Sequence, residues 1–391
     1  MKKTYIDTAM ERIAPDLILK GGNVVDVFSG RVIKADVIIK DGIICGVGSY
    51  SGENEQDVSG KYIMPGFIDS HVHIESSMTQ PSEYAKAVMP HGITTVIADP
   101  HEITNVCGED GLEFMLKSAK NIPLDVNLML PSCVPATPFE HTGANLDAKT
   151  TQKLAPKFFG IGEMMNYPGI VSGDDETLGK LCLDIIDGHA PLLSGHELDA
   201  YASVGIKTDH ECSVVEEMTE KISKGMYILL REGTLSLDVA KLIKGVTPYT
   251  LRRCAFCTDD RFVGEIIRDG SIDHCIRKAV SLGLNNIDAI IMATLNACEM
   301  YGMKNKGAIA PSYVADIVVA DDLNLSSISQ VYKNGKLVCE NGTALFECET
   351  VDNSKVTNTV HLPKISADFF KTDVKDKFDA IELIPESIIT K

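Results

Sequence analysis

Short segments that alternate hydrophobic and polar residues occur near both ends of the chain. Between residues 16 and 64, four of them each close with Gly or Asp-Gly, which is typical of β-hairpins: DLILKGG, NVVDVFSG, ADVIIKDG and IICGVG. The pattern returns from residue 315, in ADIVVADD and VYKNGKLV. Two groups of hairpin strands on either side of a long middle predict one small β-sandwich that is formed from both flanks of the chain.

The middle of the chain, residues 65–302, alternates short apolar strands with helical stretches. We count about eight such βα units, and the span agrees with the ~250 residues of a (β/α)8 barrel. The right-handed connection rule leaves a barrel or a doubly wound parallel sheet as the two candidates. Polar residues gather at the carboxyl ends of these strands, and in a barrel those ends converge on one mouth. We therefore expect an α/β fold with a (β/α)8 TIM-type barrel.

These patterns also predict the domain organisation. Residues 1–64 and 303–352 are expected to form the N-terminal and C-terminal parts of the sandwich, and residues 65–302 the barrel. The last stretch, residues 353–391, is mixed in pattern. We expect it to be a linker or the start of a truncated C-terminal domain.

The charge of the chain narrows the choice of partner. Its 391 residues are 44% hydrophobic and carry a net charge of -18. So acidic a protein is repelled by phosphate backbones and anionic lipid, which argues against nucleic acid or a membrane surface as a partner.

The sequence has no secretory signal and no apolar run near the ~20 residues that span a bilayer, so its 11 cysteines are expected to be reduced. We expect a cytoplasmic protein that acts on a small molecule.

His71 and His73 stand two residues apart at the end of the apolar strand MPGFIDSH. Side chains two apart on a strand point to the same side, so both imidazoles can face the barrel mouth. Two imidazoles on one face form a divalent transition-metal site when further ligands complete it. The alternative is two polar residues in a surface turn, but the apolar strand before them makes a surface position awkward.

Four further metal-ligating side chains close later strands: Glu163, His189, His210 and Asp259. Each of them alone is explained better by capping or hydrogen bonding. Together with the histidine pair, such residues recur at the ends of strands one, four, five, six and eight, which is hard to obtain by chance, and in a closed barrel these ends meet. Four imidazoles and two carboxylates suit Mn²⁺, Fe²⁺ or Zn²⁺, and the sequence does not choose among them.

A second set of polar residues, Asp99, His101 and Glu102, follows the second barrel strand at the same mouth. These side chains could bind an additional metal. A hydrogen-bond network that orders the other ligands is at least as good an interpretation. His101 and Glu102 do not form a zincin motif, because HEITN lacks the second histidine.

Other residues near the strand ends are candidates for a substrate pocket. Arg231 and Glu232 close the seventh strand, where Glu232 could contact a ring nitrogen of a heterocyclic substrate and act as a catalytic group. An ion pair at the rim of the barrel explains them equally well. Glu75, Ser76 and Ser77 lie beside the first histidine pair and could shape the pocket.

Six motifs together resemble the adenine deaminase branch of the amidohydrolase superfamily: FIDSHVHIESS, GITTVIADPHEI, GIGEMMNYPG, DGHAPLLSG, TDHE and CTDDR. The resemblance covers nearly the whole chain, and GEMMN and CTDDR separate this branch from its relatives. It implies a barrel with two metal ions at its mouth and favours manganese or iron over zinc. It also implies how the ligands are shared. The more buried metal would be held by His71, His73 and Asp259, and the outer metal by His189 and His210. Glu163 would bridge the two metals, in place of a carboxylated lysine.

The reaction that the resemblance implies is deamination of adenine to hypoxanthine and ammonia. Two metals that share a water lower its pKa enough to supply hydroxide at neutral pH, and Asp259 can accept a proton and deliver it to the departing amine. Hydrolysis of a cyclic amide, as in dihydroorotase-like relatives, and a non-catalytic barrel scaffold are the alternatives. Members of this branch usually continue for a further domain and are expected to be homo-oligomers.

Overall fold

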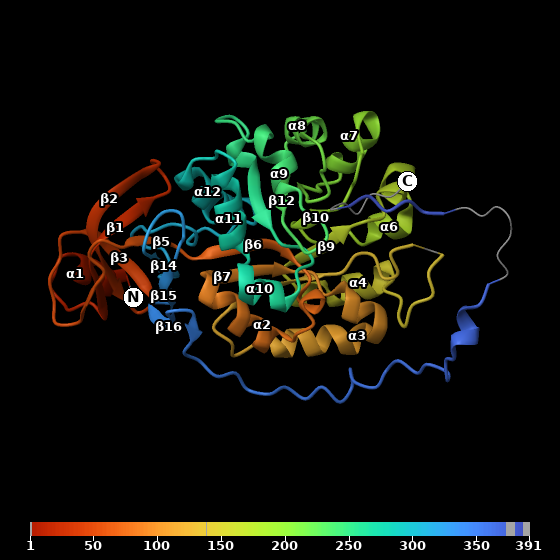
Figure 1. Ribbon diagram of the computed structural model, residues 1–391, viewed down its shortest axis with the longest axis horizontal. Coiled ribbons are helices and arrows are strands. Elements are labelled where there is room, and N and C mark those ends of the chain that lie inside the picture. The colour runs from red at the N-terminus through yellow and green to blue at the C-terminus, as the bar shows by residue number, and fades with distance from the viewer. Residues whose placement is uncertain (1, 138, 373–379, 386–391) are drawn as a thin grey trace.

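The computed structural model describes residues 2–137, 139–372 and 380–385. Strands from both flanks of the chain pair in one nine-stranded mixed sheet, which Figure 1 shows at one end of the molecule in red and blue. Its members are β1 (Leu17–Asp26), β2 (Arg31–Lys40), β3 (Ile43–Gly48), β4 (Glu55–Asp57), β5 (Tyr62–Pro65), β14 (Ile317–Ala320), β15 (Ile328–Lys333), β16 (Lys336–Glu340) and β17 (Thr343–Ala344). The expected union of the two flanks is therefore confirmed at the level of one sheet, whereas the sandwich stays a prediction.

The two flanks meet where β14 pairs antiparallel with β5, with Ile317 opposite Pro65. The first two predicted segments differ from expectation, because LILK and NVVD belong to the single strand β1. A register shift between Leu19 and Gly22 marks a β-bulge there, and Gly21 adopts a left-handed φ of 71° that suits glycine. The Gly-Gly pair thus bends one strand, where the pattern had predicted a hairpin turn.

Eight parallel strands follow in two sheets. Five of them pair in sequence order and three more pair separately. The strands are β6 (Phe67–Val72), β7 (Ile93–Ala98), β8 (Asp125–Leu130), β9 (Gly160–Met164) and β10 (Ile186–Gly188), then β11 (Thr208–Asp209), β12 (Tyr227–Arg231) and β13 (Cys254–Cys257). Every residue of β6 and β7 is buried, as expected for parallel strands that are covered on both faces.

The two parallel sheets approach each other at two places, which we call seams. At the first, β6 lies beside β13, and at the second, β10 lies beside β11. Beside β6 and β13, the backbone N–H of Asp259 donates to the carbonyl of His71 at 3.0 Å, and the N–H of His73 donates to the carbonyl of Asp259 at 3.1 Å. At the other seam the N–H of Gly188 donates to Oγ1 of Thr208 at 3.0 Å. The parallel strands therefore curl into a barrel-like arrangement whose carboxyl ends lie on one side.

Helices connect and surround these strands (Figure 1). They are α2 (Pro81–Val88), α3 (His101–Ser118), α4 (Ala148–Leu154), α5 (Tyr167–Ser172), α6 (Asp175–Gly179), α7 (Gly195–Ser203), α8 (Val215–Ser223), α9 (Val239–Leu242), α10 (Val263–Asp269), α11 (Ile272–Ser281), α12 (Asn286–Met292) and α13 (Leu295–Met300), with α1 (Lys2–Ala9) beside the nine-stranded sheet. None of the helices within the described residues is long and apolar enough to cross a membrane.

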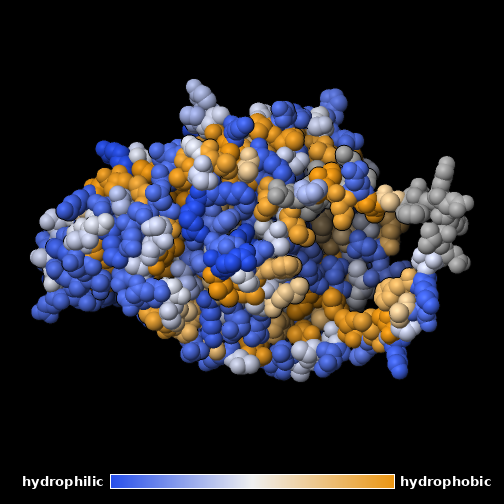
Figure 2. Space-filling model, viewed as in Figure 1, coloured by the Kyte–Doolittle hydropathy of each residue, from blue (hydrophilic) through white to orange (hydrophobic). Residues whose placement is uncertain are grey.

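The chain after β17 runs in an extended form beneath α2 and α3 (Figure 1). Lys355 pairs with Asp110 of α3 at 2.8 Å, and Lys86 of α2 lies 3.4 Å from Glu347. The end of the molecule that the nine-stranded sheet forms has a mainly hydrophilic surface in this view (Figure 2). The division into the predicted domains stays a prediction.

Candidate metal centre

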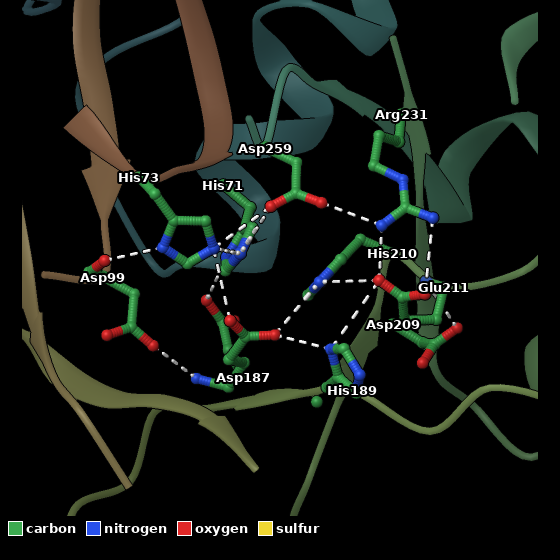
Figure 3. Close-up of polar contacts among 12 residues, drawn as sticks. His71, His73, Asp99, Asp187, His189, Asp209, His210, Glu211, Arg231 and Asp259 are labelled. Carbon is green, nitrogen blue, oxygen red and sulfur yellow. Dashed lines mark hydrogen bonds and ion pairs between the residues drawn. The ribbon is translucent and has the colours of Figure 1, made fainter. Parts of the chain in front are cut away.

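Six side chains predicted from the strand ends lie together at the carboxyl side of the parallel strands, and Figure 3 shows five of them labelled. Two come from the end of β6, one from β9, and one each from the residues that follow β10, β11 and β13. They are His71, His73, Glu163, His189, His210 and Asp259. Residues that are nearly 190 positions apart therefore become neighbours because parallel strands point their carboxyl ends the same way.

One half of this cluster is built around His73. Its Nε2 lies 3.1 Å from Nε2 of His71, 3.1 Å from Oδ1 of Asp259 and 3.2 Å from Oε1 of Glu163. The Nδ1–H of His73 donates to the carbonyl of Asp99 at 2.7 Å, which leaves Nε2 free to bind a cation. Atoms that bind one ion at ~2.1 Å lie roughly 3 Å from one another, so these four atoms match a single metal position.

The other half is built around the second oxygen of Glu163. Oε2 lies 2.6 Å from Nδ1 of His189 and 3.2 Å from Nε2 of His210. The imidazoles of His71 and His210 stack with their centroids 4.1 Å apart and so connect the two halves. A carboxylate whose two oxygens face two separate sets of imidazoles has the arrangement of a bridging ligand.

The electrostatics of the cluster favour a cation. Burial opposes the ionised form of Glu163, but the charge of His189 and hydrogen bonds from His101, His189 and His210 hold its pKa well below the usual value. Burial likewise opposes a charged His210, yet the hydrogen bond and charge of Glu163 raise its pKa to about 9. The carboxylates are thus stabilised as anions by positive charge, which two divalent ions would supply more directly. The donor set and its spacing fit such ions.

Arg231, at the end of β12, connects the cluster to further acidic residues. Its Nη1 donates to Oδ2 of Asp259 at 2.8 Å and also to Glu211, and its Nε donates to Asp238 at 3.1 Å. All four side chains are buried. Arg231 therefore forms ion pairs, with Asp259 as one of its partners, but these pairs are buried and do not lie at the rim of the barrel.

Glu232 faces away from this cluster. Its Oε1 accepts a hydrogen bond from Lys278 of α11, and it does not line the cavity beside Asp259. Alternation along a strand explains the difference, because Arg231 and Glu232 point to opposite sides. An ion pair accounts for the contacts of Glu232, and its contact with a ring nitrogen stays a prediction.

Asp99, His101 and Glu102 lie beside Glu163 and His73. Oδ2 of Asp99 accepts from the backbone N–H of Glu163 at 2.9 Å, and Nδ1 of His101 lies 3.2 Å from Oε1 of Glu163. Oε2 of Glu102 lies 3.6 Å from Nδ1 of His73. These contacts agree with a network that orders the predicted ligands, while the extra metal stays a prediction.

A cavity of about 240 Å³ opens beside Asp259 and is lined by Ser76, Arg231, Thr234 and Phe262 among others. Oγ of Ser76 donates to Asp260 and, at 3.3 Å, to Glu102. Ser76 and Arg231 thus line this cavity, and their role in a substrate pocket stays a prediction.

The neighbours of Ser76 take other positions. Ser77 donates to the carbonyl of Ile74 and closes a turn. Glu75 does not line this cavity, and burial followed by the charge of Glu102 raises its pKa to about 8.

Two buried carboxylates near the cluster were missed in the sequence. Glu211 follows His210 and lies 3.4 Å from its Nε2. Asp187 lies 3.8 Å from Nδ1 of His71 and accepts a hydrogen bond from Tyr301 at 3.0 Å. Asp187 lies in β10 two residues before His189, which directly follows the strand, so the alternation that singled out His71 and His73 could have found it.

Comparison with known proteins identifies close relatives of the sequence. The model of the amidohydrolase family matches residues 62–338. The chain is 46% identical to adenine deaminase 2 of Desulfotalea psychrophila and 47% identical to an adenine deaminase of Clostridium acetobutylicum. Each alignment covers 99% of this chain and 69% of the relative.

Solved structures share the fold at lower identity. A β-aspartyl dipeptidase of Fervidobacterium islandicum in complex with a β-Asp-Leu dipeptide superimposes with a TM-score of 0.59 at 19% identity, over 86% of this chain and 98% of that chain. An atrazine chlorohydrolase of Arthrobacter aurescens complexed with zinc gives 0.58 at 15% identity, over 88% and 99%. The family match and these neighbours confirm the prediction of a TIM-type barrel.

Proposed function

This chain belongs to the adenine deaminases of the amidohydrolase family, and we propose that it deaminates adenine hydrolytically at a pair of divalent metal ions. The observation that supports the metal pair is the position of Glu163, whose oxygens lie 3.2 Å from His73 and 2.6 Å from His189. His71, His73 and Asp259 would hold the more buried ion, His189 and His210 the outer one, and Glu163 both. Manganese or iron is proposed, and zinc is compatible with the same donors.

Bound metal ions would lower the pKa of a water molecule enough to supply hydroxide near neutral pH. The residues of the chain then have to orient the purine and move protons. Asp259 is suited to accept a proton and to return it to the departing amine, because Arg231 holds one of its oxygens and leaves the other toward the histidines. The cavity beside Ser76 and Arg231 is proposed to hold the purine ring.

We also propose that the eight parallel strands form one closed (β/α)8 barrel of residues 65–302 and that the two flanks form a sandwich. The hydrogen bonds between His71, His73 and Asp259 support closure at the first seam. A homo-oligomer and a cytoplasmic location stay predictions.

The central experiment measures metal content and substrate turnover on the same preparation. After loading with manganese, we expect about two ions per chain and release of ammonia and hypoxanthine from adenine. A panel that includes other aminopurines and cyclic amides separates deamination from ring opening. Ring opening of a cyclic amide without turnover of adenine would reject the assignment, and a chain that retains no stoichiometric metal would support a scaffold.

His71→Ala tests the assignment of the cluster. It should abolish metal-supported turnover without unfolding the chain, because His71 supplies one imidazole and only a small part of the core. Activity that persisted in this variant, with the circular dichroism spectrum unchanged, would show that the site has been assigned to the wrong residues.

A further inference from the structure

Lys221 of α8 is a fully buried cation next to the metal cluster. Its ammonium donates to the carbonyl of Ala190 at 2.6 Å, to Oδ2 of Asp209 at 2.9 Å and to Oε1 of Glu217 at 2.7 Å. These bonds use all three donors of the group, which is what a buried ammonium needs in order to be tolerated. The side chain is 0% exposed.

Two of the partners of Lys221 adjoin the loops that follow β10 and β11 and carry His189 and His210, whereas Glu217 lies on α8 itself. Ala190 directly follows His189, and Asp209 directly precedes His210. The N–H of Ala190 also donates to Oδ1 of Asp209 at 2.9 Å, so Lys221 closes a ring of contacts between the loops.

Glu217 extends the same ring along both loops. Its Oε1 accepts from the N–H of Leu192 at 2.7 Å, and its Oε2 accepts from the N–H of Ser213 at 3.3 Å. Lys221, Asp209 and Glu217 therefore set the distance between the backbone segments on which the two histidines stand.

The more buried half of the cluster has different supports. The imidazole of His73 is oriented by the carbonyl of Asp99, and Asp259 is held by Arg231. None of the hydrogen bonds of Lys221 recorded among the described residues reaches these groups.

We propose that Lys221 is a positioning residue for the outer metal ion and acts by fixing His189 relative to His210. This inference rests on the proposed function, because it requires two metal positions. Loss of the cation would leave Asp209 and Glu217 as facing carboxylates inside the protein, and their repulsion would spread the loops. Residues that orient metal ligands typically change metal affinity by about 10- to 100-fold when they are replaced.

The test is Lys221→Met, with Lys333→Met as a control for the loss of a buried lysine elsewhere in the protein. Lys333 is also a buried lysine between two carboxylates, 2.7 Å from Asp125 and 2.7 Å from Asp316, but Asp125 begins β8 at the end of the strand away from the cluster. Manganese dissociation constants are measured for each variant by equilibrium dialysis, together with kcat as a function of manganese concentration.

Wild type and K333M should bind about two ions with unchanged affinities. In K221M the dissociation constant of the more weakly bound ion should rise about 10- to 100-fold, while that of the more tightly bound ion stays the same. Excess manganese should then restore most of kcat. Unchanged constants in K221M, or equal loss at both positions, would overturn the role of Lys221. A wild type that binds no metal would instead reject the proposed function.

Glu217→Gln keeps the inference testable if K221M does not fold. The amide retains the shape of the side chain and removes one charge from the ring, so a smaller rise confined to the weaker constant is expected. A folded E217Q with both constants unchanged would overturn the inference in the same way.

Discussion

The guanidinium of Arg231 lies 2.8 Å from Oδ2 of Asp259, while Oδ1 of the same carboxylate lies 3.1 Å from Nε2 of His73. The two oxygens of Asp259 therefore have separate partners. One is held by a fixed cation, and the other is directed into the cluster, where a proton has to move during deamination.

Arg231→Met should lower kcat by about 100-fold or more, because Asp259 loses its orientation and Glu211 loses the buried guanidinium with which it pairs. Steady-state deamination of adenine measures the effect. Arg253→Met is the control, since Arg253 lies at the other end of the neighbouring strand and contacts the carbonyl of Gly225. Equal losses in both variants would indicate a general defect of folding.

Asp259→Asn separates metal binding from proton transfer. The amide keeps one oxygen that can face the metal position but is a poor proton acceptor, so kcat should fall by about 10²- to 10⁴-fold while part of the metal is retained. Metal analysis and turnover are measured on the same sample. Unchanged turnover would exclude Asp259 as the group that moves the proton.

Gly162→Ala tests the link between Asp99 and Glu163. A methyl group at this position would come within 2.1 Å of Oδ2 of Asp99, the atom that accepts the N–H of Glu163 at 2.9 Å. We expect a loss of about 1–3 kcal/mol in the free energy of unfolding, with weaker manganese binding.

Gly264→Ala is the matched control for this substitution. The new methyl group of G264A would meet no atom within 4 Å, and the residue lies in the first turn of α10. Denaturant unfolding should show no destabilisation in G264A, and a loss as large as that of G162A would refute the proposed clash.

Asp36 predicts a pH-dependent stability that is independent of the proposed metal centre. Its carboxylate accepts from the N–H groups of Gly21 and Tyr50 and from Lys20 at 2.8–3.0 Å. Burial acts against the ionised form, but these hydrogen bonds outweigh it and lower the pKa below 3.8. The stability that this carboxylate contributes is fully present above the pKa that Asp36 has in the unfolded chain. It is lost as the pH falls through the lower pKa of Asp36 in the folded protein.

Asp36→Asn should therefore cost about 1–3 kcal/mol near neutral pH, because the amide loses charge-assisted hydrogen bonds. The difference in melting temperature between wild type and D36N should shrink as the pH is lowered below 3.8. A difference that stayed constant over that range would show that the charge of Asp36 contributes nothing.

The cluster could be predicted from the sequence because its members obey the geometry of parallel strands. His71 and His73 lie two residues apart at the end of one strand, and Glu163 closes a buried apolar segment. Their places at the strand ends are therefore enough to bring all three to the same mouth of the barrel. The contacts of Glu232 could not be predicted, since its partner Lys278 comes from a helix that is distant in sequence. Lys221 was also missed, because a lysine on an amphipathic helix normally faces solvent and only tertiary packing shows that this one is buried.

The bulge in β1 was missed for a related reason. Gly21 and Gly22 follow an apolar run and satisfy the usual pattern of a turn. Only the pairing of β1 with β2 on both sides of the bulge shows that the strand continues.

The antiparallel pairing of β5 with β14 has a consequence for how the protein is made. β5 leads through Gly66 directly into β6, yet its partner on one side lies beyond the entire barrel, so that Lys61 and Asp321 pair across 260 residues. A nascent chain on the ribosome must keep that edge of β5 unpaired until the barrel has been synthesised. Co-translational folding of this enzyme is therefore expected to finish late, and the exposed edge is the segment that a chaperone would have to protect.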